Sequence, residues 1–167
     1  MSKQEPLQQI KERRDGVLAA LAARTPYLQF MGIRFERRGD ELTAIMAFDE
    51  KLIGNPVLRA LHGGATASFL EAAAIMQLSW DRAWDQMENG HLTAEEIATP
   101  KGFALPKTID LTVDYLRSGL ARDSYARVKL NRAGRRYASV HIEAWQDNRD
   151  RLFAQASGHF LMPPQDG

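Results

Sequence analysis

Two features of the sequence could act on a carbonyl group: the glycine pair in His62-Gly63-Gly64 and the carboxylate of Glu71. The glycines precede a long apolar stretch that predicts a helix over residues 65–87. The first N–H groups of a helix have no partner inside it and carry partial positive charge. Such a helix start can polarise a carbonyl or hold an oxyanion. A tight turn into the helix is the other interpretation of the two glycines.

Glu71 lies in the most apolar part of this predicted helix, between Phe69 and a run of three alanines. A helix that is apolar on most sides is usually buried on most sides. Because burial of a carboxylate costs free energy unless the group is paired or neutralised, a catalytic role is one explanation of Glu71. A solvated helix face or a structural hydrogen bond is the alternative.

The spacing of Gly63 and Glu71 predicts an assembly. On one helix their separation is a rise of roughly 12 Å, at about 1.5 Å per residue, which is too long for both to act on one carbonyl. Two antiparallel copies of the helix, related by a two-fold axis, would bring Gly63 of one copy near Glu71 of the other. We therefore expect a homodimer with two sites at its interface.

The remaining elements must position these groups. Hydrophobic periodicity predicts an N-terminal helix over 5–24, ended by Pro26, and a hairpin of strands at 31–37 and 41–49. A loop is expected at 53–61, and 89–106 reads as loop with one short capped helix near 93–96. Alternating apolar residues predict four more strands, at 107–116, 124–131, 137–147 and 151–161, the last three forming an antiparallel meander.

This order predicts an α+β fold, in which an antiparallel sheet of about six strands wraps around one long central helix. The N-terminal helix is additional to that plan. We expect residues 1–24 to be a helical extension and residues 25–167 to be the catalytic domain.

Composition narrows the function further. The 167-residue chain carries 22 Lys and Arg against 21 Asp and Glu, so nothing in its overall charge predicts a nucleic-acid partner. It has no cysteine, which excludes disulfides and a cysteine nucleophile and is typical of a reducing compartment. The start is polar and no segment is apolar enough to span a bilayer, so we expect a cytoplasmic protein without a secretory signal.

Other catalytic motifs are missing from the sequence. It has no H-E-x-x-H metal spacing, no G-x-S-x-G nucleophile elbow and no glycine-rich phosphate loop. We therefore predict no metal site and no cofactor. The remaining histidines, at positions 91, 141 and 159, are interpreted as surface or structural residues.

The combination of Leu61-His62-Gly63-Gly64, an apolar helix with Glu71, and the strand 108–117 (TIDLTVDYLR) resembles the hotdog-fold thioesterases. The similarity is to the 4-hydroxybenzoyl-CoA and phenylacetic-acid-degradation type and extends from about residue 25 to 162. It implies a hotdog fold and hydrolysis of an acyl-CoA thioester to free acid and CoA thiol. Because a thiolate is a good leaving group, no cofactor is needed.

The resemblance also implies roles for individual residues. Gly63 corresponds to the glycine whose N–H polarises the thioester carbonyl, and Glu71 to the acidic nucleophile or general base. Asn55 is the candidate for an amide that many relatives carry before the histidine, and His62 is expected to order the loop. We expect four further residues to contact substrate: Gly64, Phe69, Ile75 and Arg117.

Alternatives remain at this point. Hotdog folds also include acyl-thioester hydratases and dehydratases, in which His62 and Glu71 would transfer protons, and a non-catalytic acyl-CoA-binding protein is a further possibility. Basic residues concentrated in the meander either form a solvated face or contact the phosphates of CoA. The assembly is expected to be a homodimer or a homotetramer.

Overall fold

The computed structural model describes residues 5–164 of the chain. Within that range it has four α-helices, one short 3-10 helix and eight strands. The helices are α1 (Leu7–Ala23), α2 (Pro26–Met31), α3 (Gly63–Glu88) and α4 (Ala94–Ala98), with the 3-10 helix at Glu50–Leu52. The strands are β1 (Ile33–Arg38), β2 (Glu41–Met46), β3 (Ile53–Asn55), β4 (Ala60–Leu61), β5 (Lys107–Tyr115), β6 (Ser124–Ala133), β7 (Tyr137–Trp145) and β8 (Ala154–Leu161).

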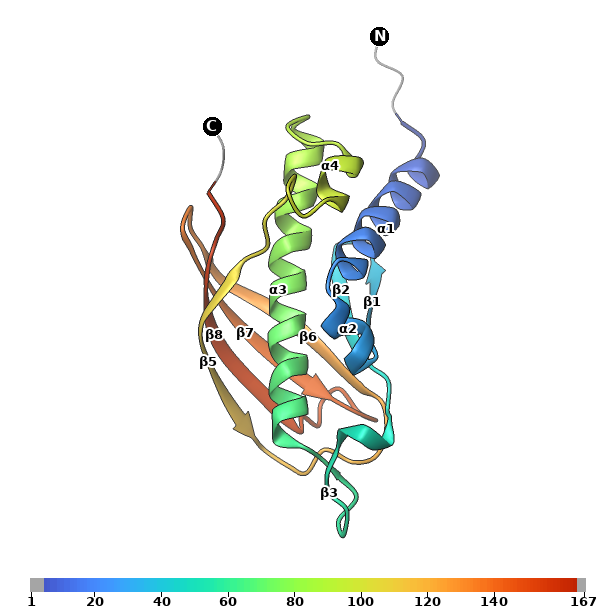
Figure 1. Cartoon of the computed structure of the whole chain (residues 1–167), viewed down its shortest axis with the longest axis vertical. Coiled ribbons are helices and arrows are strands. Elements are labelled where there is room, and N and C mark those ends of the chain that lie inside the picture. The colour runs from blue at the N-terminus through green and yellow to red at the C-terminus, as the bar shows by residue number, and fades with distance from the viewer. Residues whose placement is uncertain (1–4, 165–167) are drawn as a thin grey trace.

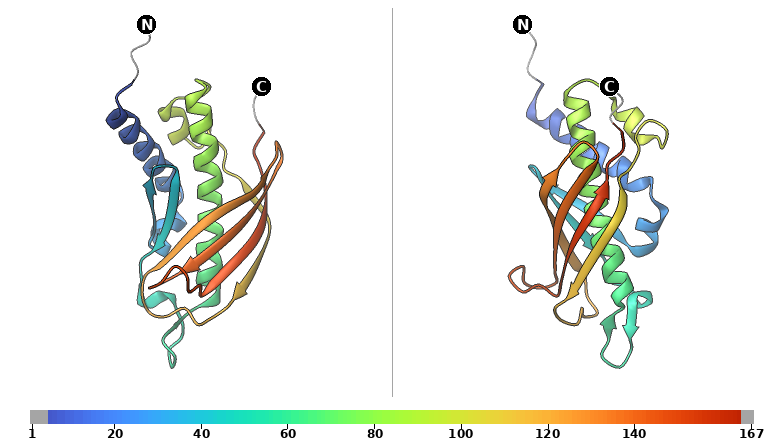
Figure 2. Two further views of the ribbon diagram at one scale, coloured as in Figure 1. Left: turned by 180° about the vertical axis from the view of Figure 1, so that it is seen from behind. Right: turned by 90° about the vertical axis from the view of Figure 1, so that its left-hand side faces the viewer.

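The main sheet has six strands in the order β1-β2-β6-β7-β8-β5, and every neighbouring pair is antiparallel. It curves around α3, which crosses its concave face (Figures 1 and 2). This arrangement confirms the predicted α+β hotdog architecture with its additional N-terminal helix. The predicted meander is also confirmed, because β6, β7 and β8 are consecutive neighbours.

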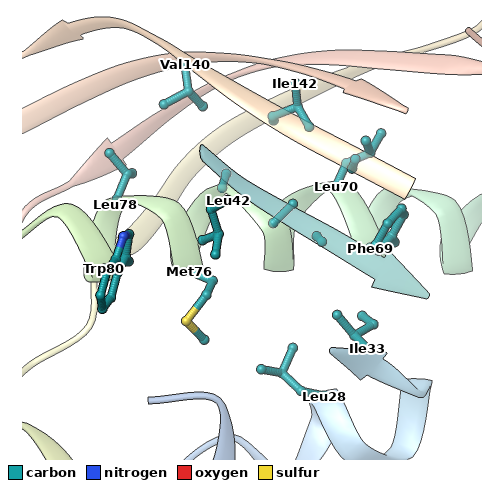
Figure 3. Close-up of a cluster of buried hydrophobic side chains, with 14 of the residues drawn as sticks. Leu28, Ile33, Leu42, Phe69, Leu70, Met76, Leu78, Trp80, Val140 and Ile142 are labelled. Atoms are coloured by element: carbon teal, nitrogen blue, oxygen red, sulfur yellow. The ribbon is translucent and has the colours of Figure 1, made fainter. Parts of the chain in front are cut away.

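The core lies between α3 and the sheet (Figure 3). Phe69 and Leu70 of α3 are completely buried, and they share the core with Val140 and Ile142 of β7. Side chains on β7 alternate between buried and half-buried, as expected for a strand with one face on the core. The buried residues of the main sheet include six alanines: Ala44, Ala126, Ala138, Ala144, Ala154 and Ala156. Small side chains on both surfaces let the sheet approach the helix closely.

Three short elements were not predicted: α2, the 3-10 helix at Glu50–Leu52 and the β3–β4 hairpin. Residues after Pro26 form α2 instead of leading straight into a strand, because proline is favoured in the first turn of a helix as well as after its end. Gly32 ends α2 with a left-handed φ of 66°, which shifts the start of β1 from the predicted Met31 to Ile33. The expected loop at 53–61 contains the β3–β4 hairpin, seen below the start of α3 in Figure 1.

The N-terminal helix packs beside α3 and α4. Its residues Val17, Leu18 and Leu21 are buried in the same core as the α3 side chains. At the end of this helix, the Arg24 guanidinium donates to the carbonyl oxygens of Ile97 (3.1 Å) and Phe103 (2.7 Å). Burial lowers the pKa of Arg24.

The short helix α4 forms as predicted. Thr93 and Glu96 make a reciprocal capping box, in which the side chain of each accepts a hydrogen bond from the backbone N–H of the other. The hydrogen bonds that the Thr93 N–H and the Thr93 hydroxyl donate to the Glu96 carboxylate lower its pKa. The segment that follows α3 is thus ordered, and hydrogen bonds from Arg24 hold it against the N-terminal helix.

Strand β5 contains a register shift that its alternation of apolar and polar residues did not predict. Thr108 pairs with Phe160 while Asp110 pairs with His159, so Ile109 is an extra residue between them. Before the shift Thr108 faces α3. After it, Leu111 and Val113 do so, opposite Gly158 and Ala156. The predicted alternation, with Ile109 among the inward residues and Thr108 outward, is therefore wrong at this end of the strand, and Ile109 is 52% exposed.

Candidate active site

The first turn of α3 leaves the N–H of Gly63 open at its start. His62 is the N-cap residue, and its Nδ1 accepts a hydrogen bond from the Gly64 N–H at 2.8 Å. The carbonyl oxygen of His62 accepts from the Thr66 N–H. Gly63 is the first helical residue, so its N–H has no acceptor within the helix. This is the group that the sequence singled out for a carbonyl oxygen.

Three neighbouring elements hold this helix start in place. The His62 N–H donates to the carbonyl oxygen of Leu52 at 2.8 Å, and Gly54 of β3 packs directly against His62. From β5, the Tyr115 hydroxyl donates to the carbonyl oxygen of Gly63 at 2.8 Å. The ring of Tyr115 also lies over Gly63. The backbone at Gly63 is therefore fixed from two sides.

A cavity of about 400 Å³ opens at this point. Gly63 and Arg117 both line it, together with Tyr115 and Phe153. The structure thus brings together two of the residues predicted from sequence, a backbone N–H and an exposed guanidinium. A carbonyl compound with a negatively charged group is the chemistry that these two donors suit.

Glu71 lies two turns further along α3 and is half-buried. Its Oε1 accepts a hydrogen bond of 2.5 Å from the hydroxyl of Thr108 on β5. A hydrogen bond of this kind fixes the rotamer of a carboxylate. Oε2 accepts no hydrogen bond from residues 5–164, so it is the oxygen available for chemistry.

Gly63 and Glu71 belong to one continuous helix, which supports the spacing argument. Eight residues of α-helix correspond to a rise of roughly 12 Å. Within one protomer the open N–H and the carboxylate are therefore separate half-sites.

The other predicted residues fall in different places. Gly64 is exposed at the helix start, and Ile75 is half-buried one turn after Glu71 on the same helix face. Asn55 is exposed in the β3–β4 hairpin, where its Oδ1 accepts from the N–H groups of Val57 and Leu58. In this protomer its side chain shapes that turn and contacts neither Gly63 nor Glu71.

Phe69 is completely buried between α3 and the sheet. Figure 3 shows its ring among core side chains. It has no surface to offer a ligand here, because the helix face that carries it is turned away from Glu71. We assign Phe69 to the core and not to the substrate-binding residues.

Thr108 and Tyr115 are functional candidates that sequence reasoning missed. Both were part of the alternating strand pattern, and nothing in that pattern distinguishes them from their neighbours. Thr108 is 37 residues from Glu71 and Tyr115 is 52 residues from Gly63. Only the packing of β5 along α3 brings them to the two half-sites.

Residues 5–164 contain neither a candidate metal-binding cluster nor a candidate membrane-spanning helix. No group of three His, Asp or Glu side chains lies in a position to hold a metal ion. None of the helices in this range is both long enough and apolar enough to cross a membrane.

The family described as "Acyl-CoA thioesterase N-terminal domain" matches residues 55–161, which include α3 and β5 to β8. This chain belongs to the hotdog-fold acyl-CoA thioesterases. The thioesterase is also similar to curated proteins named medium/long-chain acyl-CoA thioesterase YigI. The YigI proteins of Salmonella typhimurium and Escherichia coli are each 31% identical over 140 residues, which cover 82% of this chain and 85% of theirs.

Solved structures share this fold. A protein from Chromobacterium violaceum is 30% identical with a TM-score of 0.63, over 94% of this thioesterase and 98% of that chain. A Shewanella oneidensis protein related to the thioesterase superfamily has a TM-score of 0.70 at 24% identity, covering 96% and 100%. The PaaI protein from the phenylacetic acid degradation operon of E. coli has a TM-score of 0.67 at 15% identity, covering 91% and 94%. The last two similarities support the fold alone.

Proposed function

We propose that this thioesterase hydrolyses acyl-CoA thioesters at sites built from Gly63 of one protomer and Glu71 of a second. The observation that carries the proposal is the combination of an open helix start with a carboxylate held by Thr108. The N–H of Gly63 polarises the thioester carbonyl and stabilises the oxyanion that develops on its oxygen. His62 keeps the turn in shape by capping the neighbouring N–H.

Glu71 performs the second half of the reaction through Oε2. As a general base it takes a proton from water, whose oxygen attacks the carbonyl carbon, after which the C–S bond breaks and CoA leaves as a thiolate. As a nucleophile it forms a mixed anhydride that water then hydrolyses. After a single turnover in water labelled with heavy oxygen, label in the Glu71 carboxylate would establish the nucleophilic route, because water has then opened the anhydride at the Glu71 carbonyl carbon.

A two-fold homodimer supplies both groups to each site. The helix face around Glu71 is only partly covered in the protomer and carries Gly64, Ala67, Ser68 and Ile75. Small residues let a second helix approach closely. At the edge of the sheet, β5 carries the exposed side chains Ile109 and Tyr115, so the same second copy can cover both surfaces. Light scattering against the 18.8 kDa chain mass distinguishes dimer from tetramer.

The substrate class follows from the curated relatives. Proteins 31% identical to this chain are named medium/long-chain acyl-CoA thioesterases, and we propose the same acyl range here. We also propose that the enzyme works in the cytoplasm, where a cysteine-free chain and a CoA thioester substrate are both expected.

The deciding experiment measures free-thiol release from butyryl-, decanoyl-, palmitoyl- and benzoyl-CoA by the wild type and by Glu71→Gln. We expect hydrolysis to be fastest with decanoyl- or palmitoyl-CoA. The variant should lose roughly 10²- to 10⁴-fold in kcat, the range expected for a general base, while its circular dichroism stays unchanged.

Each saturated substrate also tests the alternatives, because a hydratase cannot consume it. Equal turnover by both proteins would overturn the role of Glu71. Absence of wild-type turnover on all four substrates would overturn hydrolysis itself.

A further inference from the structure

The turn between β6 and β7 borders a cavity of about 510 Å³ on the outer face of the sheet. Arg132, Arg135 and Arg136 line it, together with Tyr137, Ser139 and His159. The lining is rich in N–H and O–H donors, and the Tyr137 side chain is 59% exposed. None of these residues belongs to the half-sites described above.

The three guanidinium groups have no ion-pair partner among the residues that the structure describes. Within residues 5–164, none of them takes part in an ion pair or a side-chain hydrogen bond, whereas most other arginines of the chain do. Asp81 and Asp85 border a second cavity together with Arg135, but neither carboxylate forms an ion pair with the Arg135 guanidinium. Three like charges on one turn repel one another, so an anion bound between them would stabilise the turn.

Strand pairing places further donors beside these arginines. Arg132 pairs with Ser139, Ser139 pairs with His159, and His159 pairs with Asp110 on β5. The Asp110 carboxylate lies 2.9 Å from His159 Nδ1, which orients the imidazole. A guanidinium, a hydroxyl and an imidazole thus stand in one row across three adjacent strands.

The cavity lies at the same end of the sheet as the Glu71 half-site. In the next row of the sheet, Ala138 pairs with Phe160, and Phe160 pairs with Thr108, the hydrogen-bond donor to Glu71. Ala138 is therefore roughly 10 Å from Thr108, at about 4.8 Å per strand. The pantetheine arm of CoA is longer than this separation, and it can pass over the end of the sheet beside Lys107.

We propose that this cavity binds the phosphate groups at the nucleotide end of the CoA thioester. The inference rests on the proposed function, because it takes acyl-CoA as the substrate. Guanidinium groups match phosphate oxygens with paired N–H donors. Ser139 and His159 add donors on one side, and the exposed Tyr137 ring offers a surface on which adenine can stack. Among the basic residues of the meander, Arg132, Arg135 and Arg136 are therefore the ones that contact phosphate in this proposal.

The test compares decanoyl-CoA with decanoyl-N-acetylcysteamine, a thioester that lacks the nucleotide. In the triple variant Arg132→Ala, Arg135→Ala, Arg136→Ala we expect the KM for decanoyl-CoA to rise about ten-fold or more, since several charge-assisted hydrogen bonds are lost. The kcat should stay within about two-fold, as for a loss of uniform binding. Kinetics with decanoyl-N-acetylcysteamine should not change, and adenosine 3′,5′-bisphosphate should inhibit the wild type but not the variant.

A charge-matched control removes three positive charges elsewhere: Arg38→Ala, Lys101→Ala and Arg151→Ala. It should retain the wild-type KM for decanoyl-CoA. An equal rise in KM in this control would overturn the site in favour of general electrostatic attraction. An unchanged KM in the triple variant would also overturn it, as would a loss seen only with decanoyl-acyl carrier protein, which would indicate a protein-docking surface.

The outcomes separate this inference from the proposed function. If the wild type hydrolyses neither thioester, hydrolysis itself is wrong. If it hydrolyses both with similar KM values, the proposed function stands and the nucleotide site is wrong.

Discussion

At the residue scale, a single extra residue in β5 determines what Glu71 contacts. The bulge at Ile109 turns Thr108 toward α3, where its hydroxyl donates to Glu71 at 2.5 Å. Without the bulge, Thr108 would face outward beside Asp110, since successive side chains of a strand alternate. The orientation of the proposed catalytic carboxylate thus depends on an irregularity in the neighbouring strand.

Replacing Thr108 by valine removes that hydrogen bond while conserving shape. We expect Thr108→Val to lower kcat about five- to ten-fold, as for the loss of one hydrogen bond worth about 1–1.5 kcal/mol. Thr108→Ser keeps the hydroxyl and should retain most activity. Steady-state kinetics on decanoyl-CoA check both variants, and wild-type kcat in Thr108→Val would show that Glu71 needs no such support.

The backbone N–H of Gly63 can be removed without disturbing the helix. Proline is favoured at the first helical position, and His62, with φ −64° and ψ 132°, already has the extended conformation required before proline. We expect Gly63→Pro to fold normally and to lose roughly 10²- to 10³-fold in kcat, the cost of losing one oxyanion donor.

Gly63→Ala is the matched control for this N–H, because it keeps the donor. Its Cβ would lie 3.4 Å from the Tyr115 ring, an ordinary contact. Nearly wild-type kinetics are expected. Equal losses in the alanine and proline variants would attribute the effect to the added side chain and not to the N–H.

At the scale of elements, the β3–β4 hairpin sets the position of the helix start. Gly54 of β3 passes so close to His62 that a Cβ at position 54 would lie 2.5 Å from the Cα of His62. Since the N-cap histidine belongs to α3, any side chain on Gly54 must displace either the hairpin or the first turn of the helix. The unpredicted three-residue strand β3 is thus part of the proposed oxyanion site.

We expect Gly54→Ala to destabilise the protein by about 1–3 kcal/mol, the usual cost of an overpacked site, and to lower kcat by displacing the Gly63 N–H. Gly16→Ala, in the exposed middle of α1 with open space at its Cα, should instead stabilise the protein by about 0.5–1 kcal/mol. Thermal unfolding of both variants checks the pair. An unchanged melting temperature in Gly54→Ala would mean that the hairpin adjusts freely.

At the scale of the whole molecule, one protomer contains both halves of the proposed chemistry but not one complete site. The open N–H and the carboxylate are on one rigid helix, and bending cannot bring them together. The N-terminal helix covers the far end of α3, where Arg24 ties it to the segment after α4. We therefore retain, as a proposal, that residues 1–24 extend a hotdog domain formed by residues 25–167.

Sites shared between protomers make a distinctive prediction for mixed dimers. Glu71→Gln and Gly63→Pro should each be inactive, yet a heterodimer of the two contains one site with both groups intact. With random pairing of equal amounts, about one quarter of all sites are intact, so about one quarter of wild-type activity should return. Thiol-release assays on mixed dimers, purified after co-expression of differently tagged chains, measure the activity that returns. If no activity returned, each site would lie within one protomer.

The sequence by itself determined the order of the main elements and identified the two candidate groups, the N–H of Gly63 and the carboxylate of Glu71. The strand alternation and the long apolar helix are local patterns with periods of two and 3.6 residues, so the sequence alone predicts them. Gly63 and Glu71 stand out for the same reason, as glycines before a helix and a carboxylate within an apolar run. The fold class followed from that order.

Only the tertiary structure decided which side chains meet. Thr108 reaches Glu71 and Tyr115 reaches Gly63 across separations of 37 and 52 residues, and the first contact also depends on the bulge at Ile109. The tertiary structure likewise places Phe69 in the core. It also brings Arg132, Ser139 and His159 into one row, although they belong to three different strands. The register of strands that are distant in the chain, such as β5 and β8, depends on the packing of the whole sheet on α3, and the alternation within one strand does not specify it.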